Sequence, residues 1–324
     1  MHTLRMYQLR QYLRNRLTLA VLFLCIGAGI VYSISNFERL FLGGDEIDCD
    51  TDYKFINPEP DCELYEEKVD TLRNLELKLL QTVATLRQEE VMPVKMSVWV
   101  RDLQTRRFVG IEENDLYLIP QFLKLPTAVA AYKYVEFDQN FLSRNITYTE
   151  EGVKRTDTVE ILIEKMLIES SDTATQVITQ NLPSAFKENV FKTLGLLVNT
   201  PSGDTRFFVT ARSYANIFRT LYNGSYLSRD ASERVLALLQ RKDAHEGMAA
   251  LIKEGTAVAE KYSERILQTS QSIDLHQISD CGIVYLQNDE PFIFCIMTEG
   301  ADLSTLRKTN EVLLKIVAGE FGYY

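Results

Sequence analysis

The groups in this sequence best suited to chemistry are two lysines and a short run that contains two serines. Lys124 lies in an apolar segment, Ser170-Ser171-Asp172 follows, and Lys261 comes later in a β-rich segment. A serine hydroxyl is a nucleophile when a neighbouring base takes its proton, and a lysine can be that base if burial or a second cation favours its neutral form. These residue types point to acyl-transfer chemistry if the fold brings them together.

Lys124 follows a proline-marked turn, Pro120-Gln121-Phe122-Leu123, that leads into a predicted helix. Gln121 lies one helical turn before Lys124 and would share its face. An amide is not a nucleophile that a lysine can activate, and no serine occurs from Arg106 to Leu142. Read alone, the segment is also compatible with an ordinary amphipathic helix that carries one lysine.

The other two segments also have simple structural interpretations. Ser170-Ser171-Asp172 interrupts a helical pattern that runs from Thr156 to Gln180, so it can end one helix and cap the next. Lys261 belongs to a predicted strand from Thr256 to Tyr262, where a half-exposed lysine is unremarkable. The order and separation of the three segments carry more weight than any one of them.

That order resembles the class A β-lactamase and penicillin-binding transpeptidase superfamily, over about Glu63 to Tyr324. In that family Ser-x-x-Lys begins a buried helix, Ser-Asp-Asn lies on a loop of a helical lobe, and Lys-Thr-Gly lies on a strand that faces the helix. The resemblance implies that Gln121 stands at the nucleophile position and that Lys124 is the lysine of the first motif.

The second motif corresponds to Ser171-Asp172-Thr173, with Thr173 in place of asparagine. The resemblance implies that Ser171 would move protons, that Asp172 would hold the loop, and that Thr173 would line the substrate site. The same residues are also explained as the N-terminal cap of a helix.

The third motif corresponds to Lys261-Tyr262-Ser263, with Tyr262 and Ser263 in place of threonine and glycine. The resemblance implies that these two residues line the substrate site. A β-carbon where glycine allows close approach would narrow that site.

The departures from the family pattern predict a catalytically inactive protein. A glutamine replaces the nucleophile, and the Glu-x-x-x-Asn segment that activates the deacylating water in class A enzymes is missing between the second and third motifs. Such a protein could bind a cell-wall peptide or dock a partner. Two alternatives stay open: an active serine hydrolase in which Ser171 is the nucleophile and a lysine is the base, and a spacer whose interaction element is the helix predicted from Glu63 to Glu90.

The expected fold is α+β. Hydrophobic periodicity predicts strands near both ends of this region and a block of helices between them, which implies one antiparallel sheet built from both chain ends, helices on both of its faces, and a helical lobe. Predicted strands lie at Met96 to Leu103, Arg107 to Ile111, Thr256 to Tyr262, Gly282 to Leu286 and Pro291 to Thr298. Predicted helices lie at Gln121 to Val135, Thr156 to Gln180, Pro183 to Leu194, Thr210 to Tyr222, Ser228 to Gln240, Gly247 to Lys253 and Ala301 to Ala318.

The N-terminal part predicts a membrane anchor. Residues 1–16 carry four arginines and no acid, and residues 17–37 carry no charge, so the basic tail is expected in the cytoplasm and the rest outside. A cleavable signal peptide is the alternative. Residues 38–62 read as a linker, and residues 63–324 as the catalytic-type domain. The net charge of −10 argues against nucleic-acid binding.

The cysteines and histidines predict no metal site and no cofactor. The five cysteines and three histidines show no metal-ligand spacing. Cys49 and Cys62 bracket a polar loop and are a candidate disulfide, with two free thiols as the alternative. Cys281 and Cys295 lie in apolar runs and are interpreted as small buried residues.

Overall fold

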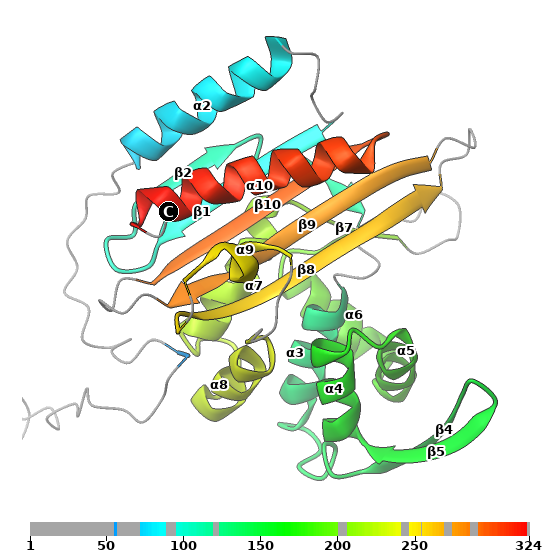
Figure 1. Cartoon of the computed structure of the whole chain (residues 1–324). Helices are drawn as coiled ribbons and strands as arrows, with labels where there is room; N and C mark the ends of the chain where they lie inside the picture. The colour runs from blue at the N-terminus through cyan, green and yellow to red at the C-terminus, as the bar shows by residue number, and fades with distance from the viewer. Residues whose placement is uncertain are drawn as a thin grey trace, which may run out of the picture. The chain divides into compact units, whose positions relative to one another are not determined.

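A five-stranded antiparallel sheet joins strands from the two ends of the domain (Figure 1). Its order is β2-β1-β10-β9-β8, so β10 pairs with β1 at the centre. The prediction of one sheet assembled from both chain ends is confirmed. The strands are β1 (Lys95–Asp102), β2 (Phe108–Ile111), β8 (Ala257–Gln268), β9 (Asp274–Tyr285) and β10 (Phe292–Gly300).

The computed structural model describes residues 55–56, 72–88, 95–118, 123–199, 206–240, 246–253, 255–268, 274–285 and 291–322. The predicted membrane anchor, Cys49, Cys62 and Gln121 lie outside these residues. Within the ranges described, no helix combines the length and apolarity needed to cross a membrane.

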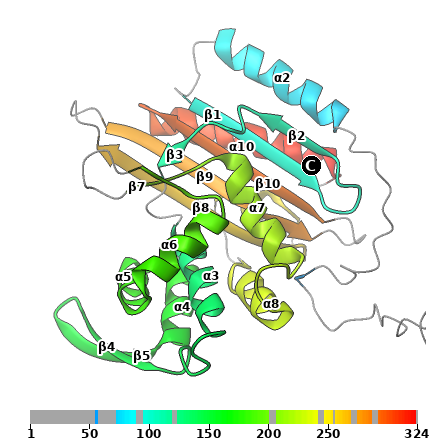
Figure 2. The ribbon, with the colours of Figure 1, turned by 180° about the vertical axis from the view of Figure 1, so that it is seen from behind.

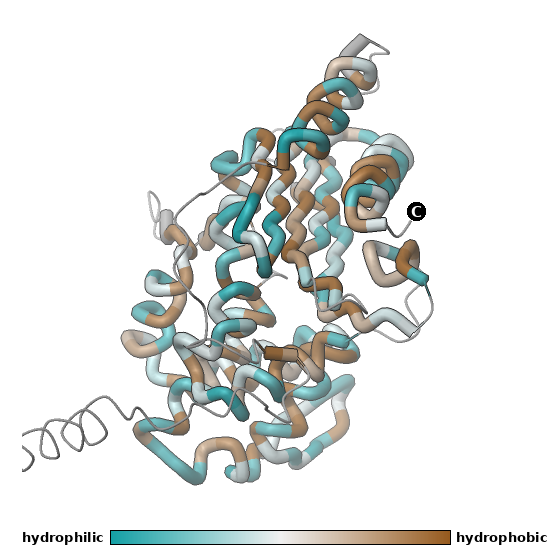
Figure 3. The backbone as a smooth tube through the Cα atoms, turned by 90° about the vertical axis from the view of Figure 1, so that its left-hand side faces the viewer, coloured by the Kyte–Doolittle hydropathy of each residue, from teal (hydrophilic) through white to brown (hydrophobic). Residues whose placement is uncertain are grey.

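Each face of the sheet packs against helices, as the sequence predicts. The first face covers a core with α2 (Arg73–Gln88), α9 (Met248–Leu251) and α10 (Leu303–Glu320). The second face packs against α7 (Ala211–Tyr222) and the helical lobe (Figure 2). Both faces of the sheet are covered and strand side chains alternate between them, so β10 is buried along almost its whole length. Hydrophobic segments run through the sheet (Figure 3).

The helical lobe surrounds α3 (Lys124–Tyr134), which is buried from Lys124 through Tyr132. Thr158 caps α4 by accepting a hydrogen bond from the backbone N–H of Ile161. The lobe also contains α4 (Val159–Ile168), α5 (Asp172–Asn181), α6 (Ser184–Thr193) and α8 (Arg229–Leu238).

Two elements differ from the sequence-based expectation. A β-hairpin of β4 (Asn145–Glu150) and β5 (Val153–Thr158) precedes α4, so the predicted helix start at Thr156 is wrong. Glu151 and Gly152 both adopt positive φ and make the turn. A small three-stranded sheet forms from β3 (Tyr117–Leu118), β7 (Arg206–Val209) and β6 (Leu197–Asn199).

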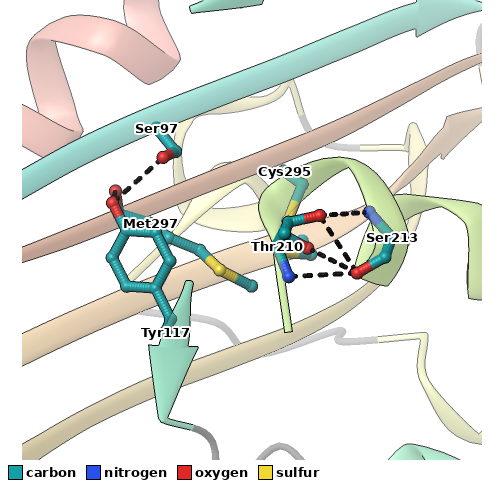
Figure 4. The surroundings of a disulfide bond; sticks show 7 residues. Ser97, Tyr117, Thr210, Ser213, Cys295 and Met297 are labelled. Atoms are coloured by element: carbon teal, nitrogen blue, oxygen red, sulfur yellow. Dashed lines mark hydrogen bonds between the residues drawn. A yellow bond between two sulfur atoms is a disulfide. The ribbon is translucent and has the colours of Figure 1, made fainter. Parts of the chain in front are cut away.

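Cys281 of β9 and Cys295 of β10 form a disulfide, which corrects their interpretation as free buried thiols. The two residues are direct partners in the antiparallel pairing, so their side chains leave the sheet on the same face. Nearby, the hydroxyl of Tyr117 donates to the Met297 carbonyl (Figure 4).

Candidate functional site

Lys124 is placed by the start of α3 and is almost completely buried. Its Nζ donates to Oδ1 of Asp172 at 2.5 Å. The Lys124 side chain is 4% exposed, whereas that of Asp172 is 80% exposed. Since α3 is buried from Lys124 through Tyr132, the ion pair with Asp172 compensates a charge that would otherwise be costly to bury.

Lys261 reaches the same turn from the sheet. It is buried in β8, and its Nζ donates to Oγ of Ser170 at 2.7 Å and to the carbonyl of Leu167 at 3.4 Å. Lys261 is the direct cross-strand partner of Cys281, so the lysine and the disulfide lie side by side on the same face of the sheet. Two lysines far apart in sequence therefore contact residues of the turn between α4 and α5.

Ser170 and Ser171 differ in what their hydroxyls do. Oγ of Ser171 accepts a hydrogen bond from the backbone N–H of Ala174 at 3.1 Å and caps α5, which confirms the capping prediction. Ser170 is exposed, has a φ of 57°, and presents its hydroxyl to Lys261. We call Lys124, Ser170, Asp172 and Lys261 the motif site.

The structure does not bring Tyr262 to the motif site. Neighbouring residues of a strand point to opposite faces, and the Tyr262 hydroxyl donates to Oε2 of Glu264. Glu264 in turn binds Arg307 of α10, on the first face of the sheet. Burial, together with the carboxylates of Glu246 and Glu264, raises the pKa of Tyr262. Its expected role in lining the substrate site beside Lys261 is therefore not supported by its position.

Ser263 shares the face of Lys261 and is buried, as strand alternation requires. Thr173 is half-buried in the first turn of α5.

Two cations fix the short strand that precedes Gln121. Lys95 donates to the carbonyl of Leu116, and Arg265 donates to the carbonyl of Leu118. Arg265 also donates to Oε1 of Gln277 at 2.6 Å, and burial lowers its pKa to about 10. The sheet thus holds β3 at both ends, immediately before the segment that contains the first motif.

Chemically, the motif site consists of two ammonium donors with one hydroxyl and one carboxylate acceptor. Lys124 Nζ lies beside the carboxylate and Lys261 Nζ beside the hydroxyl, so each lysine has one polar partner in the turn between α4 and α5.

Sequence reasoning missed Ser170 and Arg265. The sequence did contain a signal for Ser170. Ser171 directly precedes the helix and is the expected N-cap, so the hydroxyl of Ser170 is available for another contact. Arg265 had no such signal, since a lone arginine in a strand does not reveal which carbonyl it meets.

Known proteins agree with this architecture. A model of the beta-lactamase enzyme family matches residues 78–318. No curated protein matches the chain. The structure of PBP-A superposes with a TM-score of 0.65 at 19% identity, covering 80% of this chain and 99% of that chain.

Two bacterial enzymes give similar results. A class A beta-lactamase from Mycobacterium abscessus has a TM-score of 0.63 at 18% identity, covering 75% of this chain and 98% of that one. A beta-lactamase from Chitinophaga pinensis has a TM-score of 0.65 at 13% identity, covering 77% of this chain and 100% of that one. The TM-scores show a shared fold, and the family model covers most of the domain. The chain belongs to the beta-lactamase enzyme family.

Proposed function

We propose that the protein is a membrane-anchored, extracytoplasmic member of this family that does not form an acyl-enzyme. In this proposal the motif site binds a carboxylate-bearing cell-wall peptide. The observation that carries it is the pair of buried lysines, Lys124 and Lys261, that converge on one turn while residue 121 is glutamine. Binding groups are present, but a nucleophile at the family position is not.

The contacts of the turn support a binding role. Ser170 and Asp172 are exposed, and a buried ammonium lies directly behind each of them. Asp172 is already paired with Lys124, so the Ser170 hydroxyl, with Lys261 Nζ at 2.7 Å behind it, is the group of the turn that can donate to a ligand carboxylate. Hydrogen bonds of this kind contribute more than neutral ones and give directional recognition of a carboxylate.

The disulfide supports an extracytoplasmic location. Disulfides persist in oxidising compartments and are rare in the cytosol. Cys281 and Cys295 are joined within the described part of the chain, in agreement with an N-terminal anchor at residues 17–37 that exports the domain. Fractionation of cells that express the chain with and without residues 1–37 tests the anchor directly.

A second candidate is a serine hydrolase that uses a serine of the turn. Ser171 was the sequence-based choice, but its hydroxyl caps α5, whereas Ser170 Oγ lies 2.7 Å from Lys261 Nζ. If acyl transfer occurs, we therefore propose Ser170 as the nucleophile. In that case Ser170-Ser171-Asp172, rather than Ser171-Asp172-Thr173, corresponds to the Ser-Asp-Asn motif of the family, and Asp172 stands at the asparagine position.

One experiment separates the two candidates. The purified full-length protein is incubated with fluorescent penicillin and with a fluorophosphonate, and covalent labelling is read on a gel. We expect no labelling of the natural protein. If the natural protein is labelled, and if Ser170→Ala abolishes the labelling while Ser171→Ala preserves it, the protein is a serine hydrolase. The proposal that it forms no acyl-enzyme would then be overturned.

Peptide binding is measured by calorimetry with soluble cell-wall peptide fragments. We expect Lys261→Met to weaken binding about tenfold, because it removes a charge-assisted donor. Lys154→Met, in the exposed strand β5, is the matched control and should leave affinity unchanged. Equal affinities for the two variants would remove the motif site from the binding role and favour a partner protein instead.

A further inference from the structure

Helix α2 carries apolar side chains on more than its buried stripe. Leu75, Leu79 and Val83 pack into the core, but Leu77 and Leu80 are 45% and 47% exposed. Leu77 and Leu80 are three positions apart and are therefore neighbours on one face of the helix. The exposed pair, which we call the α2 ridge, therefore suggests a surface that another molecule covers.

A groove of about 510 Å³ runs along one flank of α2, between it and α10. Lys78 comes from α2 and Lys315 from α10, and the lining includes no acidic residue. Thr82 and Thr85 also line the groove, and their hydroxyls donate to carbonyls of their own helix. We call this the basic groove.

The opposite flank has the opposite charge. A smaller hollow of about 320 Å³ is lined by Leu80, Glu112, Glu113 and Asp115. Lys78 and Leu80 are two positions apart, or about 200° around the helix, so the two hollows lie on opposite flanks of α2. We call this second hollow the acidic groove.

We propose that α2 is the contact surface of a homodimer, in which two copies pack with their α2 helices parallel. A two-fold axis parallel to α2 brings the basic groove of each copy against the acidic groove of the other, and the ridges meet at the axis. Such a contact is self-complementary, as an isologous interface must be. An antiparallel arrangement would instead place like charges together.

In the proposed contact, each lysine of the basic groove exchanges a carboxylate of its own chain for one of the partner copy. Lys78 pairs with Glu320 and Lys315 pairs with Glu311, and both lysines are at least 32% exposed. Exposed ion pairs of this kind contribute little to stability and exchange partners readily. The parallel arrangement also leaves both chains entering α2 from the same side, which suits two copies held by the membrane anchor of the proposed function.

The test is a charge swap in the full-length protein, followed by light scattering over a range of concentrations. Lys78→Glu with Lys315→Glu makes both grooves acidic, and Glu112→Lys with Glu113→Lys makes both basic. We expect the natural protein to dimerise and each double variant to dimerise about tenfold more weakly. An equimolar mixture of the two should regain dimers, which also shows that both variants are folded.

Lys154→Glu with Arg155→Glu reverses two charges on the β5 hairpin and should dimerise like the natural protein. The helix direction is read by oxidation of Arg73→Cys, which cross-links to itself only if the two α2 helices are parallel, with Leu197→Cys as an exposed control. The proposal would be overturned if the natural protein stayed monomeric at every concentration or if the charge-swap variants dimerised normally. It would also be overturned if the equimolar mixture stayed monomeric or if Arg73→Cys formed no cross-link.

Discussion

Ser170 holds a backbone conformation that its side chain does not favour. Its φ of 57° lies in the left-handed region, which most residues other than glycine avoid. Residues held this way cluster at ligand-binding and active sites, where surrounding contacts fix them. At Ser170 the contact is the hydrogen bond from Lys261.

The strain can be measured by comparing Ser170→Gly with Ser170→Ala. Both variants lose the hydroxyl, but only glycine adopts the left-handed conformation without crowding of its β-carbon. We expect the glycine variant to exceed the alanine variant in free energy of unfolding by about 1 kcal/mol, measured in urea. Equal stabilities would mean that the turn relaxes when the hydroxyl is lost.

At the scale of elements, helix α10 begins at a cap that titrates. The Asp302 carboxylate accepts hydrogen bonds from the Thr305 hydroxyl, the Ser304 hydroxyl and the Thr305 backbone N–H, and these bonds lower its pKa to about 2. The charged carboxylate also interacts favourably with the N-terminus of the helix. This contribution exists above the ordinary aspartate pKa and is lost as the pH falls towards 2.

Asp302→Ala should therefore destabilise the protein at neutral pH, with a difference from the natural protein that shrinks between pH 4 and about 2. Thermal melting across that range measures it. Asp302→Asn keeps a capping acceptor without the charge, so its own cap should show no such pH dependence. If the stability difference between the natural protein and Asp302→Ala stayed constant across this pH range, the Asp302 carboxylate would not be the group that titrates.

Elements with strong local signals were predictable, and those that depend on distant partners were not. The helix starts at Thr210 and Ser228 follow from capping residues that the structure confirms. The β4–β5 hairpin was missed because β5 is largely exposed and lacks apolar alternation. The first half of β9 was missed because it is polar in sequence, and Gln277 and Asp280 become buried only within the sheet.

At the scale of the molecule, the disulfide joins β9 to β10, the central strand of the sheet. Cys281 and Cys295 are 14 residues apart and completely buried. Their pairing could not be read from the sequence, because two apolar runs with one cysteine each do not fix which residues stand opposite one another.

Replacing both cysteines, as in Cys281→Ala with Cys295→Ala, should lower the free energy of unfolding by about 3 kcal/mol, since the unfolded chain loses a closed loop. Urea unfolding of the double variant and the natural protein measures the difference. Unchanged stability, with the same dependence on urea, would show that the bridge does not form in the purified protein.

The pairing of β1 with β10 also constrains when the domain can fold. Trp99 stands opposite Cys295, near the other end of the chain, so β1 and β2 have no central partner until β10 has been synthesised. Contacts so distant in sequence slow folding, because the intervening chain must first be brought into place. A chain that emerges from the ribosome N-terminus first would thus carry an unpaired apolar hairpin while the 180 residues between Ile111 and Phe292 follow. Chaperones that hold such a hairpin are consequently expected to matter more for this protein than its final stability suggests.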